Sequence, residues 1–206
     1  MRNEFVGSTP RLSAGGPSRK APSTSDEALI EKIASGNRLA MQALFIRHQT
    51  RIYRFVVRLV RDATLAEDLT SDVFLTVWQQ AHRFEARSSA TTWLLAIARY
   101  KTYAELRRRT EPLPDDGAAQ ASDDPADNPE AVFEIKRRGE ILRRCLTRLS
   151  REHREIIDLV YYHEKSVQEV AGIVGIPANT VKTRVFYARR RLYELLEAEG
   201  IVGALS

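Results

Sequence analysis

Glu67, Asp68, Ser71 and Asp72 are the residues whose types and spacing first suggest chemistry. On a helix, residues three and four positions apart share a face, so these side chains would form one acidic surface. Paired carboxylates can serve acid–base or metal chemistry, but no histidine, cysteine or further acid lies at a spacing that would complete such a site. We therefore favour docking against a basic partner, with an ordinary solvated acidic face as the alternative.

The cysteine and histidine content predicts no cofactor, no metal site and no enzyme. A single cysteine, Cys145, cannot form an intramolecular disulfide, and the four histidines are scattered without metal-ligand spacing. Cys145 lies among leucines and isoleucines of an expected helix. We therefore predict a buried and unreactive thiol.

A second candidate site lies in residues 84–109, where aromatic and basic residues alternate. Single-stranded nucleic acids are bound by cations that neutralise phosphates and by rings that stack on unpaired bases. Arg87, Ser88 and Ser89 form a short polar loop that could hold an extruded base. The candidate residues are Phe84, Arg87, Ser88, Ser89, Arg99, Tyr100, Lys101, Arg107 and Arg108. Trp93 is expected to belong to the core instead, and Phe84 could equally anchor the loop.

Residues 166–192, SVQEVAGIVGIPANTVKTRVFYARRRL, predict a helix-turn-helix. Gly175 suits a left-handed turn, small Ala171 allows close helix approach, and Val181 begins the apolar side of the second helix. The opposite side could read base edges and phosphates of duplex DNA. Its candidate residues are Asn179, Thr180, Lys182, Thr183, Arg184, Phe186, Tyr187, Arg189 and Arg190. The alternative is a helical hairpin with a solvated basic face.

The charge of the 206-residue chain is arranged in blocks. The formal net charge is +5, with +5 in residues 26–110 and +4 in residues 132–206, whereas residues 111–131 carry −7. This acidic segment is rich in Asp, Ala and Pro and has too little apolar surface to offset the entropy of ordering. It is predicted to be a flexible linker between two basic domains.

Both basic blocks are predicted to be helical, because apolar residues recur at spacings of three and four. In the first block we expect one helix start at a capping box of Thr64 and Glu67, and another at Trp93. The fold class is therefore all-α, with two small helical domains joined by the flexible linker. The predicted divisions are a tail (1–25), a first domain (26–110), the linker (111–131), a second domain (132–198) and a tail (199–206). The sequence shows neither a membrane-spanning run nor a secretory signal, which predicts a cytoplasmic location without membrane insertion.

Three motifs in this order resemble the extracytoplasmic-function (ECF) sigma factors, group IV of the sigma-70 family. They are DATLAEDLTSDVFLTVW, the aromatic and basic segment, and the helix-turn-helix, so the resemblance covers roughly residues 26–196. It implies a region 2 domain that binds core RNA polymerase and melts the −10 element, and a region 4 domain that reads the −35 element. Ser71, Tyr100 and Tyr187 stand where the family often has Gln, Asn and Arg.

The resemblance implies a role for each candidate surface. The acidic helix would dock on a coiled coil of the largest polymerase subunit, with the polymerase flap as a second contact. The loop and helix after Phe84 would hold the melted non-template strand, and the second helix of the helix-turn-helix would read the −35 element. Core RNA polymerase, promoter DNA and a cognate anti-sigma factor are the implied partners.

Two alternatives stay open at this stage. The acidic linker is either a plain spacer or an anionic strand that occupies a basic channel later filled by RNA. The whole chain could instead be a conventional helix-turn-helix regulator, which would bind a palindromic operator as a dimer.

Overall fold

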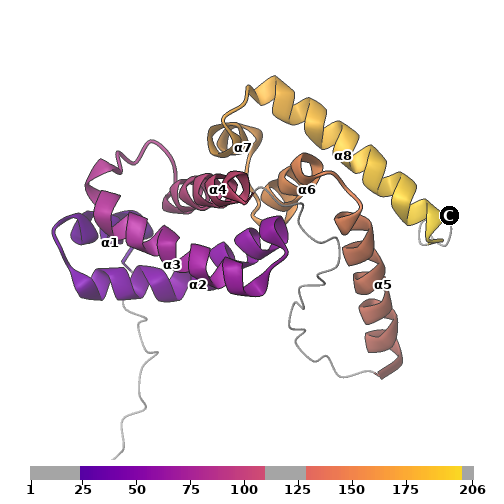
Figure 1. The fold of residues 1–206 in the computed structure, drawn as a ribbon, viewed down its shortest axis with the longest axis horizontal. Helices are drawn as coiled ribbons and strands as arrows, with labels where there is room; N and C mark the ends of the chain where they lie inside the picture. Colours follow the sequence, from indigo (N-terminus) through magenta and orange to yellow (C-terminus); the bar gives the residue numbers. More distant parts are fainter. Residues whose placement is uncertain (1–23, 110–128, 201–206) are drawn as a thin grey trace, which may run out of the picture.

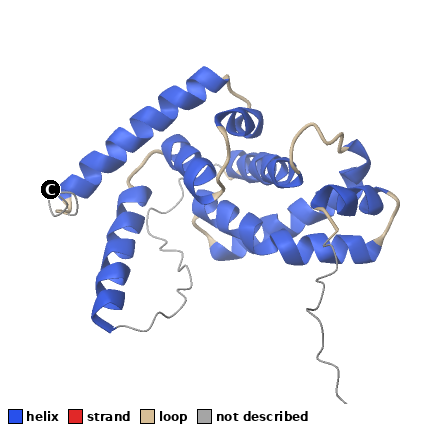
Figure 2. Cartoon of the chain, turned by 180° about the vertical axis from the view of Figure 1, so that it is seen from behind, coloured by secondary structure: helices blue, strands red, loops and turns tan. Residues whose placement is uncertain are grey.

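The computed structural model describes residues 24–109 and 129–200, and all regular structure in these ranges is helical (Figures 1 and 2). The all-α prediction is confirmed. Most of the predicted linker and nearly all of the two predicted tails lie outside the described residues. None of the helices in the described ranges combines the length and apolar character that crossing a membrane requires.

The first half is a bundle in which α2 lies against three other helices. Its elements are α1 (Asp26–Ala34), α2 (Arg38–Val60), α3 (Ala63–Gln80), the 3₁₀ turn η1 (Ala81–Arg83) and α4 (Ala90–Arg108). Helix α2 packs against α1, α3 and α4, and its Leu44, Ile52 and Phe55 are fully buried. The predicted apolar stripe of α3, from Leu65 to Val77, is also buried.

Two expected helix starts are wrong, because the capping residue of each helix lies earlier in the chain than expected. Helix α3 begins after Asp62, whose Oδ1 accepts a hydrogen bond from the Leu65 amide at 3.0 Å, so Thr64 is not the cap. Helix α4 begins at Ala90 rather than Trp93, because Ser89 Oγ accepts from the Thr92 amide at 3.3 Å. Short polar residues satisfy the unpaired amides of a first turn even where no apolar residue marks the start.

The second half contains the predicted helix-turn-helix. Its elements are α5 (Pro129–Thr147), α6 (Arg151–Ile157), the π-helical turn η2 (Asp158–Tyr162), α7 (Val167–Val174) and α8 (Ala178–Ala198). Gly175 ends α7 in the left-handed region with φ of 73°, and Val170 and Val181 are fully buried between the helices. Helix α8 packs against α5, α6 and α7, and its C-terminal end lies beside α5 (Figure 1).

Cys145 is fully buried in a small core between α5, α6 and α8. Burial raises the pKa of its thiol. The predicted buried thiol is confirmed, and a raised pKa leaves little of the nucleophilic thiolate at neutral pH.

The two halves form one continuous core. Ile156, Leu159, Val170 and Ile173 of the second half belong to the same buried cluster as the core of the first half. Helix α7 lies against α4, and both views show them adjacent (Figures 1 and 2). This contact was not predicted, because the two halves were expected to be separate domains.

The turn of the helix-turn-helix gives a stability prediction with a built-in control. Gly175→Ala should cost about 1 kcal/mol, because a Cβ at φ of 73° strains the backbone although no atom lies within 4 Å of it. Gly172→Ala, three residues earlier inside α7 and also in open space, should stabilise by about 0.5–1 kcal/mol. Urea midpoints measure both effects, and equal signs for the two variants would refute the assigned turn.

Candidate functional site

The predicted acidic face of α3 is fully accessible. Glu67, Asp68, Ser71 and Asp72 are all exposed, and the Ser71 hydroxyl bonds back to the Glu67 carbonyl oxygen at 3.1 Å. Neither Asp68 nor Asp72 pairs with a cation in the part of the chain that the structure describes. The face therefore presents unneutralised negative charge to solvent.

Two apolar side chains on the same face were missed by the sequence analysis. Leu75 is 55% exposed and Trp78 is 37% exposed. They lie at helical spacings from Asp68, Ser71 and Asp72 and off the buried stripe of α3, which was a signal available in the sequence. Apolar anchors surrounded by charges are typical of protein–protein interfaces. We call these six residues the α3 face: Glu67, Asp68, Ser71, Asp72, Leu75 and Trp78.

The loop before α4 is anchored by one aromatic side chain, and the rest of the loop is exposed. Phe84 is half-buried, and the centroid of its ring lies 5.2 Å from that of Trp93. This aromatic pair anchors the loop. Arg87 and Ser88 are exposed, and Arg87 forms an ion pair with its neighbour Glu85 at 2.5 Å. Arg87, Ser88 and Ser89 are therefore all accessible in this loop.

The predicted single-strand residues on α4 divide into an open and a covered group. Tyr100, Arg107 and Arg108 are exposed, Lys101 is half-buried, and Arg108 forms an ion pair with Glu105 at 2.8 Å. By contrast, Arg99 Nε donates to Glu155 Oε1 of α6 at 2.7 Å. Ser89 remains exposed, although its Oγ lies 3.4 Å from Glu169 Oε1 of α7.

The two carboxylates that contact α4 have pKa values shifted in opposite directions, raised for Glu155 and lowered for Glu169. Glu155 is almost completely buried, and burial raises its pKa against the opposing effect of Arg99. Its partner Tyr103 has its pKa raised to about 12 by burial and by the nearby Glu155 charge. For Glu169, partial burial acts to raise the pKa, but hydrogen bonds from Thr92, Ser166 and Lys165 outweigh it and lower the pKa to about 2.

Glu169 gives a pH prediction whose sign follows from its lowered pKa. Stabilisation by this carboxylate is fully present above its ordinary pKa of 4.5 and is lost as the pH falls toward about 2. Glu169→Gln should therefore lower the urea midpoint at pH 7, and the difference from the unmodified chain should shrink at pH 3. A difference that stays constant between the two pH values would contradict this role.

The predicted duplex-reading face of α8 is exposed except at one position. Asn179, Lys182 and Phe186 point to solvent, whereas Arg184 is half-buried and lies 3.4 Å from Glu152 of α6. The Phe186 and Tyr187 rings pack edge to face, with 5.4 Å between their centroids. The exposed residues of the set are Asn179, Thr180, Lys182, Thr183, Phe186, Tyr187, Arg189 and Arg190.

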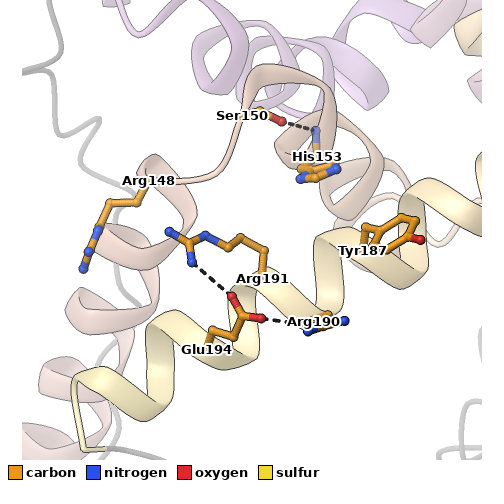
Figure 3. A pocket seen from close by; sticks show the side chains of 7 residues that line it. All are labelled: Arg148, Ser150, His153, Tyr187, Arg190, Arg191 and Glu194. Atoms are coloured by element: carbon orange, nitrogen blue, oxygen red, sulfur yellow. Dashed lines mark hydrogen bonds and ion pairs between the residues drawn. The ribbon is translucent and has the colours of Figure 1, made fainter.

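A basic groove of about 460 Å³ continues this face (Figure 3). Arg190 and Arg191 of α8 flank Glu194 at 3.2 and 3.0 Å, while His153 and Arg148 line the α5–α6 side. The Arg148 guanidinium points away from Arg190 and lies 3.6 Å from Glu199. Arg148 and His153 were not predicted as site residues, because only the folded chain brings the α5–α6 turn beside α8. Arg191 of α8 was also missed, although it follows the predicted Arg190 in sequence. The groove has the charge and hydrogen-bond donors that a DNA phosphate requires.

The described ranges contain no cluster of side chains suited to bind a metal ion. Within residues 24–109 and 129–200, no three histidine, cysteine, aspartate or glutamate side chains gather closely enough to hold a metal ion.

Comparisons with known proteins identify the family of each half of the chain. Residues 44–111 match the family model "Sigma-70 region 2", and residues 139–192 match "Sigma-70, region 4". The ECF RNA polymerase sigma factor SigK of Mycobacterium ulcerans is 33% identical over 186 residues, which cover 86% of this chain and 97% of that protein. The ECF RNA polymerase sigma factor RpoE of Cereibacter sphaeroides is 31% identical over 156 residues, 74% of this chain and 84% of that protein.

Two solved structures share the fold. CnrH in complex with the cytosolic domain of CnrY superposes with a TM-score of 0.61 at 25% identity, covering 84% of this chain and 97% of CnrH. The sigma factor RpoE of Bartonella quintana, in complex with the anti-sigma factor NepR, has a TM-score of 0.58 at 26% identity, covering 76% and 96%.

The two matched regions and their order define a transcription initiation factor of the sigma-70 type, not an enzyme. Given relatives that match across most of their length, the chain belongs to the ECF family of RNA polymerase sigma factors. It therefore binds core RNA polymerase and directs it to promoter DNA, as the sequence resemblance implied.

Proposed function

We propose that the α3 face is the surface by which this sigma factor docks on the coiled coil of the largest polymerase subunit. The observation that carries the proposal is an exposed and unpaired acidic surface around the apolar anchors Leu75 and Trp78. Opposite charges steer the encounter of two proteins, and apolar anchors hold the complex. The polymerase flap is the proposed second contact, made by the domain of residues 132–198.

The loop before α4 and the outer side of α4 hold the melted −10 strand in this proposal. Arg87 and Ser88 are exposed at the loop, where an extruded base can reach them. Tyr100 provides an exposed ring for stacking, and Arg107 and Arg108 provide cations for phosphates. These residues belong to a proposed region 2 domain of residues 26–110.

Helix α8 reads the −35 element. Asn179, Lys182 and Phe186 can reach base edges and a thymine methyl group. The groove between α8 and the α5–α6 turn receives a flanking phosphate at Arg190 and His153. Phosphate contacts of this kind fix the register of the helix in the major groove.

We further propose a cognate anti-sigma factor and a cytoplasmic location. The two structural relatives were solved as complexes with CnrY and with the anti-sigma factor NepR, which supports a protein inhibitor for this chain. Core polymerase and promoter DNA are the partners on which a sigma factor acts, and both are cytoplasmic in bacteria.

Size-exclusion chromatography of the purified chain mixed with bacterial core RNA polymerase tests the docking proposal. Stoichiometric co-elution is expected. Separate elution of a chain that circular dichroism shows to be helical would refute it.

A further inference from the structure

The loop before α4 contains a backbone conformation that residues other than glycine rarely adopt. Ala86 has φ of 52°, in the left-handed region. In this conformation the Cβ of an L-residue comes too close to the following carbonyl oxygen. Strained residues of this kind persist only where the surrounding structure determines the backbone, and they cluster at functional sites.

Both ends of the loop are firmly held. Before Ala86, the Phe84 ring packs on Trp93 with 5.2 Å between the ring centroids. After it, Ser89 Oγ accepts from the Thr92 amide at 3.3 Å and caps α4. These two anchors fix where the loop begins and ends, so the turn between them must reverse the chain within a few residues.

Between the anchors the loop has little packing. Residues 85–88 are exposed, and Figure 1 shows the loop as an arch outside the helices of the bundle. Glu85 and Ala86 border a groove of about 490 Å³ against α1 instead of a packed surface. Within the left-handed region an alanine has a narrower range of φ and ψ than a glycine. The stiffness of the loop therefore depends on Ala86 itself.

The turn at Ala86 places its two neighbours in contact. Arg87 Nη2 lies 2.5 Å from Glu85 Oε2, whereas side chains two positions apart on a right-handed helix do not face each other. Both side chains are largely exposed, so the ion pair adds little to stability. Its effect is to orient the guanidinium, whose other N–H donors stay available in a fixed plane.

An oriented Glu85–Arg87 pair suits a base better than a phosphate. A phosphate accepts hydrogen bonds but donates none, and the Glu85 carboxylate repels it. The edge of an extruded base offers acceptors beside an amino or imino donor, which match the guanidinium and the carboxylate together. Contacts to phosphates bind all sequences alike, whereas contacts to base edges select among them.

We propose that Glu85 and Ala86 are positioning residues of the −10 site. Ala86 stiffens the left-handed turn, and Glu85 orients Arg87 so that its guanidinium meets the edge of the extruded base and not the phosphates. The proposal deepens the proposed function of this loop and rests on it. It gives part of the sequence preference to two residues that the sequence analysis did not select.

Substitutions at Ala86 test the turn in the complex of the full chain with core RNA polymerase. The probe is a labelled single-stranded oligonucleotide selected by the unmodified complex from a random pool, with core polymerase alone as the blank. Ala86→Gly relieves the strain but loosens the loop, so we expect about threefold weaker binding although the urea midpoint of the free chain does not fall. Ala86→Asn, which adopts the left-handed region readily and keeps a Cβ, should bind as the unmodified chain does.

The control for a general effect of glycine is Ala198→Gly at the exposed end of α8. It should lower the urea midpoint slightly and leave binding of the oligonucleotide unchanged. A purely structural role for Ala86 would change stability and affinity in the same direction. Unchanged affinity of the Ala86→Gly variant would refute the positioning by Ala86.

Glu85→Gln tests the orientation of Arg87. We expect at least about threefold weaker binding of the selected oligonucleotide, because an unoriented guanidinium loses its contact to the base edge. Binding of a random-sequence oligonucleotide should not weaken, since a charge that repels phosphate is removed. The control, Glu31→Gln, removes an exposed carboxylate of α1 that borders the same groove and should alter neither affinity.

Arg87→Ala, alone and with Glu85→Gln, separates the inference from the proposed function. If Arg87→Ala weakens binding of the selected strand and Glu85→Gln then has no further effect, both are supported. If Arg87→Ala weakens binding but Glu85→Gln strengthens it for both oligonucleotides, Arg87 binds phosphate, and the positioning is refuted alone. An effect of Glu85→Gln that persists without Arg87 also refutes the positioning. If none of these variants changes either affinity, the loop does not hold the strand and the proposed function fails.

Discussion

Asp68→Lys/Asp72→Lys is expected to weaken the binding of core RNA polymerase by at least about a hundredfold. Reversing two charges at the centre of the α3 face turns attraction into repulsion, and such changes at interfaces cost several kcal/mol, where each 1.4 kcal/mol is about tenfold. Both side chains are exposed and unpaired within the described residues, so the fold loses no internal contact. A fluorescence titration of labelled chain with core polymerase measures the dissociation constant.

The control for this prediction is Glu31→Lys, which reverses another exposed carboxylate of the first half, on α1. It should leave polymerase affinity within about threefold, since a rim charge outside the contact contributes little. Leu75→Ala is expected to weaken binding by about tenfold at unchanged salt dependence, because it removes apolar contact and no charge. Undiminished binding by the double lysine variant would remove α3 from the docking surface.

Arg189→Ala/Arg190→Ala should weaken binding to duplex DNA carrying the −35 element by about ten- to a hundredfold. Both residues are exposed on α8, and each lost phosphate contact should also lower the salt slope of log affinity by about 1. The duplex is best obtained by selecting tight binders of the unmodified chain from a random pool. Fluorescence anisotropy across a salt series then measures both quantities.

The matched control is Arg38→Ala/Arg54→Ala, which removes two exposed cations from α2. Because this pair lies on the first half, it should change neither affinity for the duplex nor the salt slope. If the α8 variant had the same affinity and salt slope as the unmodified chain, the basic face of α8 would not contact DNA. It would then be an ordinary solvated face, which was the alternative interpretation of the sequence.

Local patterns sufficed to predict the parts of the fold that depend on neighbours in sequence. Gly175 and Val181 lie as the helix-turn-helix required, and the α3 stripe from Leu65 to Val77 is buried. Helix starts were missed at Asp62 and Ser89, because several short polar residues precede each helix and only the folded backbone shows which one accepts the first-turn amide.

The contact between the halves was beyond the reach of sequence patterns. Glu155 lies in a short segment whose spacing is that of any amphipathic helix, and its partner Arg99 is 56 positions away. Nothing local distinguishes a carboxylate that pairs across an interface from one that faces water. Arg99 and Ser89 were assigned to DNA from their types and their place in the segment after Phe84, and the structure shows that both also contact carboxylates of the second half.

Mapping of transcript 5′ ends tests the central claim most directly. Core RNA polymerase, with and without the purified chain, would transcribe fragmented DNA from the source genome in vitro. We expect discrete start sites that require the chain and share two upstream sequence elements at fixed spacing, and that disappear with Asp68→Lys/Asp72→Lys. Start sites that are identical with and without the chain, under conditions in which it co-elutes with the polymerase, would contradict its role in directing initiation.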